Sequence, residues 1–536
     1  MHRHRPALLL VPILAAAFLA IYPYLVYHVP FSTDSWPQIS SSQQILDHTP
    51  APFTDSSFFG SYVIFWPAES IFGAIASLTF NSPPIQSSPL LLPILAAVQV
   101  IVFFVIVEEL TKNSLIASVS SLIFATASFH DLFAAAITKE TYANPIFMLC
   151  MLLLLKKASW KTITLFGISL LALNFSEHAT TLFFLGAAGS IILVTSILSK
   201  KNGEKLGAKP LLPVIGIIIT ATYFILYANH SLFQISQYLN EQNIIIALSF
   251  LALVLSPVIY YTLSRPRRIL PIEESIIFCV VVAAVIFSTR TSVISLSPII
   301  PLGLLSFILP YLAVGFLALV GYRFMQARMA RASFAYIGAW TGAAVGLSAF
   351  AAFSGVPEGI FLVYRMFEYL YAPIAILAGI TLWKASTLKV SGTSIAKFLT
   401  IAIIVVITLS TSYQTYAIAS EQGSIFGAHW VYKETDLSAA EWTKSSIGET
   451  NASLSGDSHV QYLFRDYMQV NVSLNQGYEY LIGKARQEGI LVTYSLMQEN
   501  GYVLYLSGEP LPSNWMIKLG NDSSLVYSNG NVMLWN

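Results

Sequence analysis

The first 27 residues, MHRHRPALLLVPILAAAFLAIYPYLVY, join a basic end to a long apolar run. Positions 7–27 contain no charged residue, and a helix needs about 20 mostly apolar residues to cross a membrane. The stretch resembles a signal peptide, but no convincing cleavage site precedes Tyr22-Pro23-Tyr24, so we expect an uncleaved first span. An apolar run beside a basic link recurs along the chain and predicts the fold.

Composition points to a polytopic α-helical membrane protein. Hydrophobic residues make up 55% of the chain and charged residues 10%, with a mean hydropathy of +0.67. The net charge of +1 gives no reason to expect a nucleic-acid partner. The apolar runs predict thirteen spans, at about 7–27, 89–110, 114–136, 142–156, 160–176, 179–199, 211–229, 243–263, 269–287, 297–320, 333–353, 366–383 and 396–418.

Basic residues gather on one side of this topology, and basic links are retained in the cytoplasm. This places the N-terminus in the cytoplasm and leaves only Lys139, Arg290 and Arg365 as outward basic residues of the membrane region. Nineteen of the 28 Lys and Arg residues lie in links of the cytoplasmic side. They are Arg3, Arg5, Lys112, Lys156, Lys157, Lys161, Lys200, Lys201, Lys205, Lys209, Arg265, Arg267, Arg268, Arg323, Arg328, Arg331, Lys384, Lys389 and Lys397.

The segment 58–80 is apolar and long enough to span, but it carries Trp66-Pro67-Ala68-Glu69 at its centre. A central proline removes a helix hydrogen bond, and a central carboxylate is costly in lipid. If the segment spanned, most of the basic links would face outward. We therefore expect 28–88 to form one outer loop on or in the membrane surface, with a short interfacial helix starting near Trp36.

The composition becomes polar after the last span. We expect a multi-span domain over 1–425 and a small extracellular α/β domain over 426–536. Ser438-Ala-Ala-Glu441 is a plausible capping box that would open a helix. Strands are predicted at 490–494, 502–506, 524–527 and 532–535.

Asp34 directly follows the first span. It could cap the next helix, or act as a general base that deprotonates an acceptor hydroxyl at the membrane surface. Lys139 and Glu140 could form a solvated pair at a helix end, although Lys139 is one of the few outward cations. His130 and Asp131 could bind a divalent metal, but two adjacent ligands are a weak pattern without a third.

His178, at the outer end of the fifth span, is either a hydrogen-bonded interfacial residue or a catalyst. Arg365 lies at or inside an apolar span, with Glu368 one helical turn later. An arginine at membrane depth costs about 2.5–3.5 kcal/mol, so it usually has a partner. That partner is either Glu368, in an internal ion pair, or a lipid-linked phosphate that suits the planar guanidinium.

These outward polar residues share one membrane face, and no cytoplasmic domain is present to bind a nucleotide sugar. In order and side they resemble the GT-C superfamily of membrane glycosyltransferases, especially the protein-mannosyltransferase-related members of archaea. The resemblance is carried by Thr33-Asp34-Ser35-Trp36, Phe65-Trp66-Pro67-Ala68-Glu69-Ser70, Lys139-Glu140-Thr-Tyr-Ala-Asn-Pro145, the His178 site and Tyr364-Arg-Met-Phe-Glu368-Tyr-Leu-Tyr-Ala-Pro373.

The resemblance implies an inverting hexosyltransferase that uses a polyprenyl- or dolichyl-phosphate sugar. Its acceptor would be a hydroxyl of a glycan, lipid or protein at the outer face. It implies Asp34 as the catalytic carboxylate, and Lys139 and Arg365 as ligands of the donor phosphate. The remaining candidates are catalytic Glu140 and His178, phosphate-binding Arg290, and supporting Glu69 and Glu368.

The chain departs from the family in two respects. It has a single clear Asp in the first loop rather than a paired Asp-x-Asp motif, and it lacks a Trp-Trp-Asp-Tyr-Gly motif. We therefore expect transfer of single sugars and name no cofactor, with a divalent metal left open. The alternatives are a transporter or flippase of lipid-linked saccharides, which would need ionisable groups near the bilayer midplane, and a non-catalytic surface protein.

Overall fold

The computed structural model describes residues 5–48, 50, 64–203, 208–228, 240–264, 272–291, 305–354, 359–387, 393–419, 431–447, 453–504 and 507–536. The chain divides into two compact units. The helical unit consists of Met1–Ala17, Leu95–Asp131 and Tyr142–Gln414. The mixed unit consists of Phe18–Ile94, Leu132–Thr141 and Thr415–Asn536. The predicted domain boundary at residue 425 stays a prediction.

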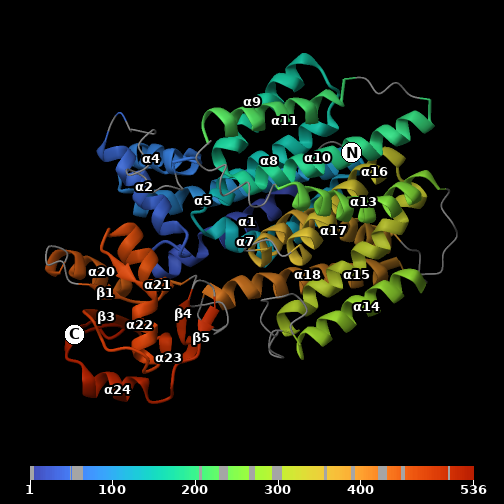
Figure 1. Ribbon diagram of the computed structural model, residues 1–536. Helices are drawn as coiled ribbons and strands as arrows, with labels where there is room; N and C mark the ends of the chain where they lie inside the picture. The colour runs from blue at the N-terminus through green and yellow to red at the C-terminus, as the bar shows by residue number, and fades with distance from the viewer. Residues whose placement is uncertain are drawn as a thin grey trace. The chain divides into compact units, whose positions relative to one another are not determined.

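Helices dominate the chain up to residue 419 (Figure 1). They are α1 Arg5–Tyr27, α2 Ser35–Asp47, α4 Ala68–Phe80, α5 Pro84–Thr111, α6 Ser114–Ala125, α7 Ser128–Ala135, α8 Lys139–Leu155, α9 Trp160–Ser176, α10 His178–Lys201, α11 Leu211–Leu226, α13 Glu241–Leu263, α14 Ile272–Ser288, α15 Leu305–Arg328, α16 Arg331–Phe353, α17 Gly359–Ser386 and α18 Thr393–Ala419.

Within the described residues, eight of these helices are long and apolar enough to cross a membrane: α1, α5, α10, α13, α15, α16, α17 and α18. A ninth span results if α6 and α7, which meet at an angle of 64°, are counted as one. The polytopic α-helical fold is thus confirmed. The number thirteen stays a prediction, because α8, α9, α11 and α14 match predicted spans but have only 16 or 17 residues.

The described part of the predicted outer loop 28–88 contains two short helices, α2 and α4, where the sequence predicted one. The expected interfacial helix is α2, whose buried face includes Trp36 and Ile39. The disputed segment 58–80 forms α4 over its described part, and its 13 residues measure about 20 Å at 1.5 Å per residue. That length is well short of a hydrocarbon core of about 30 Å, in agreement with a loop that does not cross.

Small residues allow the spans of the helical unit to approach closely. Gly379 of α17 lies against Ser120 of α6, and Gly321 of α15 lies against the carbonyl of Leu377. A Cβ at either glycine would overlap these atoms. Packing of small residues is a main source of helix association in lipid, where the hydrophobic effect between helices is absent.

The chain after residue 430 folds around a small sheet (orange and red in Figure 1). Its strand order is β2-β1-β3-β7-β6, with parallel pairs β1/β2 and β1/β3 and antiparallel pairs β3/β7 and β6/β7. Strands β4 and β5 form a separate antiparallel pair. The elements are α20 Glu434–Ser446, β1 Leu454–Ser455, α21 Ser458–Gln461, η3 Tyr462–Tyr467, β2 Val472–Ser473, α22 Leu474–Leu481, β3 Ile490–Tyr494, α23 Met497–Asn500, β4 Tyr502–Leu504, β5 Ser507–Glu509, α24 Trp515–Asp522, β6 Leu525–Ser528 and β7 Val532–Trp535.

The α/β character of this part is confirmed, and the four predicted strands correspond to β3, β4, β6 and β7. The predicted capping box at Ser438 is wrong. Helix α20 begins one turn earlier, where the Asp436 carboxylate accepts a hydrogen bond of 2.7 Å from the backbone N–H of Lys433. This carboxylate satisfies a backbone donor that the helix start leaves unpaired, so the cap forms there.

The segment that leads into α2 and the C-terminal fold share one hydrophobic core. Trp36 of α2 is fully buried, and its ring centroid lies 5.1 Å from that of Tyr432 and 5.3 Å from that of Tyr467. Val29 belongs to the same core. The packing of these aromatic rings fixes the start of α2 within the mixed unit.

Candidate functional site

Asp34 stands directly before α2 in the mixed unit, and its side chain is exposed. Its backbone is helical, at φ −68° and ψ −15°, and its carboxylate makes no capping hydrogen bond. A capping residue has an extended backbone and accepts a bond from a nearby N–H. The interpretation of Asp34 as a helix cap is therefore wrong, and the carboxylate is accessible from solvent.

The loop that carries Asp34 is joined to the segment between α7 and α8. Phe31 pairs with Ala136 in a parallel β-bridge. The Ser35 hydroxyl accepts a hydrogen bond of 2.9 Å from the backbone N–H of Ile137 and donates one of 2.5 Å to the carbonyl of Phe31. These contacts hold the residues around Asp34 against the segment that leads into Lys139.

Lys139 opens α8 and is 4% exposed. Its Nζ lies 5.2 Å from the centroid of the buried Trp66 ring, within the range of a cation–π interaction. Glu140, the next residue, is also buried. Burying an ammonium group is costly unless negative charge or π-electron density lies nearby. The Trp66 ring supplies such density, so Lys139 is not the solvated residue of one of the two sequence interpretations.

Glu69 lies in the first turn of α4 and is 5% exposed. Burial raises the pKa of Glu69 to about 8, against the opposing attraction of Lys139. Most of this carboxyl group is therefore protonated at neutral pH. Helix α4 is positioned by α2, because Ser70 donates a hydrogen bond of 3.3 Å to Gln38 and Gly73 contacts Ser42.

A second polar cluster is buried in the helical unit around Glu368 of α17. Its carboxylate accepts hydrogen bonds of 3.1 Å from the side-chain amide of Gln99 and 2.7 Å from that of Asn144. His130 Nδ1 lies 3.7 Å from the same carboxylate. Tyr369 donates to Asn144 Oδ1 at 3.3 Å, which extends the network along α17. Because buried polar groups are costly unless they are paired, this network fixes the helices that carry it.

Arg365, one turn before Glu368, has Glu177 as its ion-pair partner. Its Nη1 lies 3.6 Å from Glu177 Oε1, and His178 Nδ1 lies 3.2 Å from the same oxygen. The internal pair with Glu368, one of the two alternatives that the sequence left open for Arg365, is thus replaced by a pair between α17 and the start of α10. The reason is that the carboxylate of Glu368 is occupied by Gln99 and Asn144.

The metal candidates lie on α7, where His130 faces Glu368 and Asp131 is buried in the first turn. Among the described residues, no three His, Cys, Asp or Glu side chains gather as metal ligands. Arg290 is exposed just after the end of α14, where its backbone N–H donates a hydrogen bond of 2.9 Å to the carbonyl of Phe287.

The structure therefore sorts the predicted residues into two groups. The mixed unit holds Asp34, Glu69, Lys139 and Glu140, and the helical unit holds His130, Asp131, His178, Arg290, Arg365 and Glu368. Sequence reasoning left Gln99, Asn144, Glu177 and Tyr369 without a role. A polar residue within an apolar run marks Gln99, and Glu177 adjoins a residue that had been selected, but only the fold pairs them with their partners.

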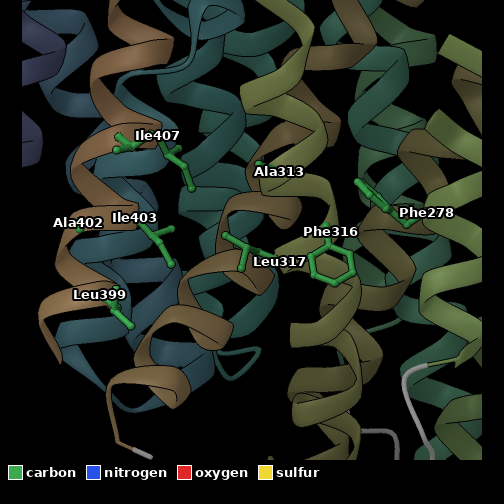
Figure 2. Close-up of a pocket in the computed structure, with 9 residues that line it drawn as sticks. Phe278, Ala313, Phe316, Leu317, Leu399, Ala402, Ile403 and Ile407 are labelled. Carbon is green, nitrogen blue, oxygen red and sulfur yellow. The ribbon is translucent and has the colours of Figure 1, made fainter. Parts of the chain in front are cut away.

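An apolar pocket of about 530 Å³ lies among α14, α15 and α18 (Figure 2). Phe278, Phe316 and Ile403 are among its nine lining residues, all of which are apolar. Such a lining accepts hydrocarbon but cannot bind a sugar or a phosphate by hydrogen bonds. The pocket contains none of the candidate site residues.

No protein-family model and no curated protein matches the sequence. The structure, in contrast, is similar to that of the archaeal oligosaccharyltransferase AglB from Archaeoglobus fulgidus, in complex with an inhibitory peptide and a dolichol-phosphate. That likeness has a TM-score of 0.56 and 11% identity, and it covers 92% of this chain and 70% of that one.

A second similar structure is that of ArnT from Cupriavidus metallidurans bound to undecaprenyl phosphate. Here the TM-score is 0.50 and the identity 11%, over 100% of this chain and 98% of the other. The likeness to both structures extends over nearly the whole chain at an identity too low to carry residue roles. The fold expected from the resemblance is confirmed, because the chain shares the fold of these two structures, AglB and ArnT, over most of its length.

Proposed function

We propose that the protein is a membrane glycosyltransferase that moves a sugar from a polyprenyl- or dolichyl-phosphate donor to an acceptor hydroxyl. The fold supports this, because two structures that share it contain a dolichol-phosphate and an undecaprenyl phosphate. The observation that carries the proposal is the exposed Asp34 carboxylate, which caps no helix and sits in a loop attached to the segment leading into Lys139.

In this mechanism Asp34 removes the proton from the acceptor hydroxyl, and the resulting oxygen attacks the anomeric carbon of the donor. The bond from that carbon to the phosphate oxygen breaks on the opposite face, so the configuration inverts. Lys139 and Arg365 each stay candidates for stabilising the negative charge of the departing lipid phosphate, and Arg290 stays a further candidate cation. Glu140 and His178 stay candidates for moving protons within the site.

The reaction takes place at the outer membrane face. The distribution of basic residues supports a cytoplasmic N-terminus and an extracellular C-terminal fold. A donor that carries its own lipid anchor suits an enzyme without access to cytoplasmic nucleotide sugars. We expect single sugars to be transferred, because the chain lacks the Trp-Trp-Asp-Tyr-Gly motif.

Replacement of Asp34 tests the proposal. We expect Asp34→Asn to lower sugar transfer by about 10²- to 10⁴-fold, the usual contribution of a general base, without changing membrane insertion or thermal stability. The assay follows radiolabelled sugar from donor lipid into acceptors in membranes. Asp47→Asn is the matched control, because Asp47 is an exposed aspartate at the other end of α2. If Asp34→Asn keeps native sugar transfer, Asp34 is not the general base.

The transporter alternative draws on the buried network around Glu368, since ionisable groups inside the membrane often line transport pathways. The same variants separate the two functions. A transporter would move lipid-linked saccharide across vesicles without forming a new glycosidic bond, and Asp34→Asn would leave that movement intact.

A further inference from the structure

The start of α10 contains a buried carboxylate, that of Glu177, whose two oxygens contact different groups. Glu177 is 1% exposed and has an extended backbone, at φ −161° and ψ 128°. Its Oε2 accepts a hydrogen bond of 2.5 Å from the backbone N–H of Thr180 and thereby caps α10. Its Oε1 faces the guanidinium of Arg365 and the imidazole of His178. One oxygen anchors the carboxylate, and the other is directed at its partners.

Thr180, which donates the capping hydrogen bond to Glu177, is itself held by buried hydrogen bonds. The Thr180 hydroxyl lies 2.5 Å from the Tyr369 hydroxyl, which also contacts Asn144. The Tyr369 ring stacks on Phe183, at 4.4 Å between centroids and 18° between planes. With these contacts in place, the carboxylate has little freedom to follow a moving guanidinium, so the guanidinium is positioned by the carboxylate.

Arg365 differs from Glu177 in its exposure. Its side chain is 32% exposed, whereas the carboxylate is buried. An arginine on a flexible stem has many conformations in solution, and a fixed negative partner reduces their number before a ligand arrives. Preorganisation of this kind improves affinity, because the ordering cost is met in the free protein.

We propose that Glu177 is a positioning residue, which holds the Arg365 guanidinium in the orientation that binds the phosphate of the donor lipid. This inference rests on the proposed function, since it assumes that Arg365 contacts the donor. It adds a residue that does not itself touch the substrate and acts through a second side chain.

The prediction concerns binding of undecaprenyl phosphate to the full-length protein in detergent, measured by native mass spectrometry at pH 7.5. We expect Glu177→Gln to weaken binding about tenfold, because the amide keeps the shape and the capping oxygen but loses the charge. Glu177→Asp, which keeps both charge and cap, should remain within about threefold of the native protein. Glu241→Gln is the control, as Glu241 is an exposed glutamate in the first turn of α13.

A double-mutant cycle with Arg365→Ala identifies the route of the effect. If Glu177 acts through Arg365, then Glu177→Gln should change affinity by less than about twofold once Arg365→Ala is present. A full tenfold loss in that background would overturn the positioning role, as would native-like affinity in Glu177→Gln. A large drop in melting temperature shared by Glu177→Gln and Glu177→Asp would instead assign the residue to stability.

The cycle also separates this inference from the proposed function. If Arg365→Ala binds undecaprenyl phosphate as tightly as the native protein, the phosphate contact is wrong and the positioning role is refuted with it. If Arg365→Ala weakens binding but Glu177→Gln does not, the phosphate contact stands and the positioning role alone is refuted.

Discussion

Titration of Glu69 offers the sharpest test of the Lys139 environment. Burial raises the pKa of Glu69 to about 8, and α4 lies outside the eight candidate spans. The perturbation is a rise of pH from 7 to 9, in the native protein and in Glu69→Gln. Above pH 8 the carboxylate becomes negative beside Lys139, where it competes with an anionic donor phosphate for the ammonium group.

The magnitude follows from this pKa. If the donor binds only when Glu69 is neutral, the apparent Kd scales with the ratio of total to neutral protein. About one tenth of Glu69 is ionised at pH 7 and about nine tenths at pH 9, given a pKa of about 8. The affinity should therefore fall about tenfold over this range. Glu69→Gln is neutral throughout, so its affinity should stay constant.

The assay is binding of undecaprenyl-phosphate glucose to the detergent-solubilised protein at several values between pH 6 and 9. A phosphodiester has no titrating proton in this range, so any pH dependence of binding arises from titration of a group in the protein. Glu434→Gln serves as the control, because Glu434 is an exposed glutamate in the first turn of α20. A decline in Glu69→Gln equal to that of the native protein would refute the reasoning, since another group would then be titrating.

Two further predictions concern the stability of the mixed unit. Trp36→Ala removes a fully buried ring from the core shared with Tyr432 and Tyr467. We therefore expect the free energy of unfolding to fall by about 3–5 kcal/mol, measured by thermal unfolding and by proteolysis of the C-terminal fold. The control Trp160→Ala, at an exposed tryptophan, should change it little. Burial raises the pKa of Asp457 to about 6 from its usual 3.8. The folded state therefore retains a proton that the unfolded state loses between about pH 4 and 6, and the free energy of unfolding should fall by up to about 3 kcal/mol as pH rises through this range. Asp457→Asn should abolish the dependence in thermal unfolding followed from pH 4 to 7, and an unchanged slope in this variant would contradict the assignment.

Local patterns in the sequence predicted most of the elements. Apolar length predicted the spans, since the bilayer sets a minimum number of residues per helix. Apolar segments separated by Gly and Asn turns predicted β3, β4, β6 and β7. Charge predicted that the segment 58–80 does not cross the membrane, because a crossing there would have inverted the basic links. The two-residue strands β1 and β2 were not predicted, because so short a segment leaves no periodic pattern to detect.

What the sequence determined by itself was the fold class and the set of polar residues to consider, because hydrophobic length and charge asymmetry act locally and can be read along the chain. Tertiary structure alone decided their partners. Arg365 and Glu368 are one helical turn apart, yet the former pairs with Glu177 and the latter with Gln99 and Asn144. The physical reason is that a buried charge selects whichever opposite or polar group the packing of helices brings within about 4 Å, and that packing joins residues far apart in the chain.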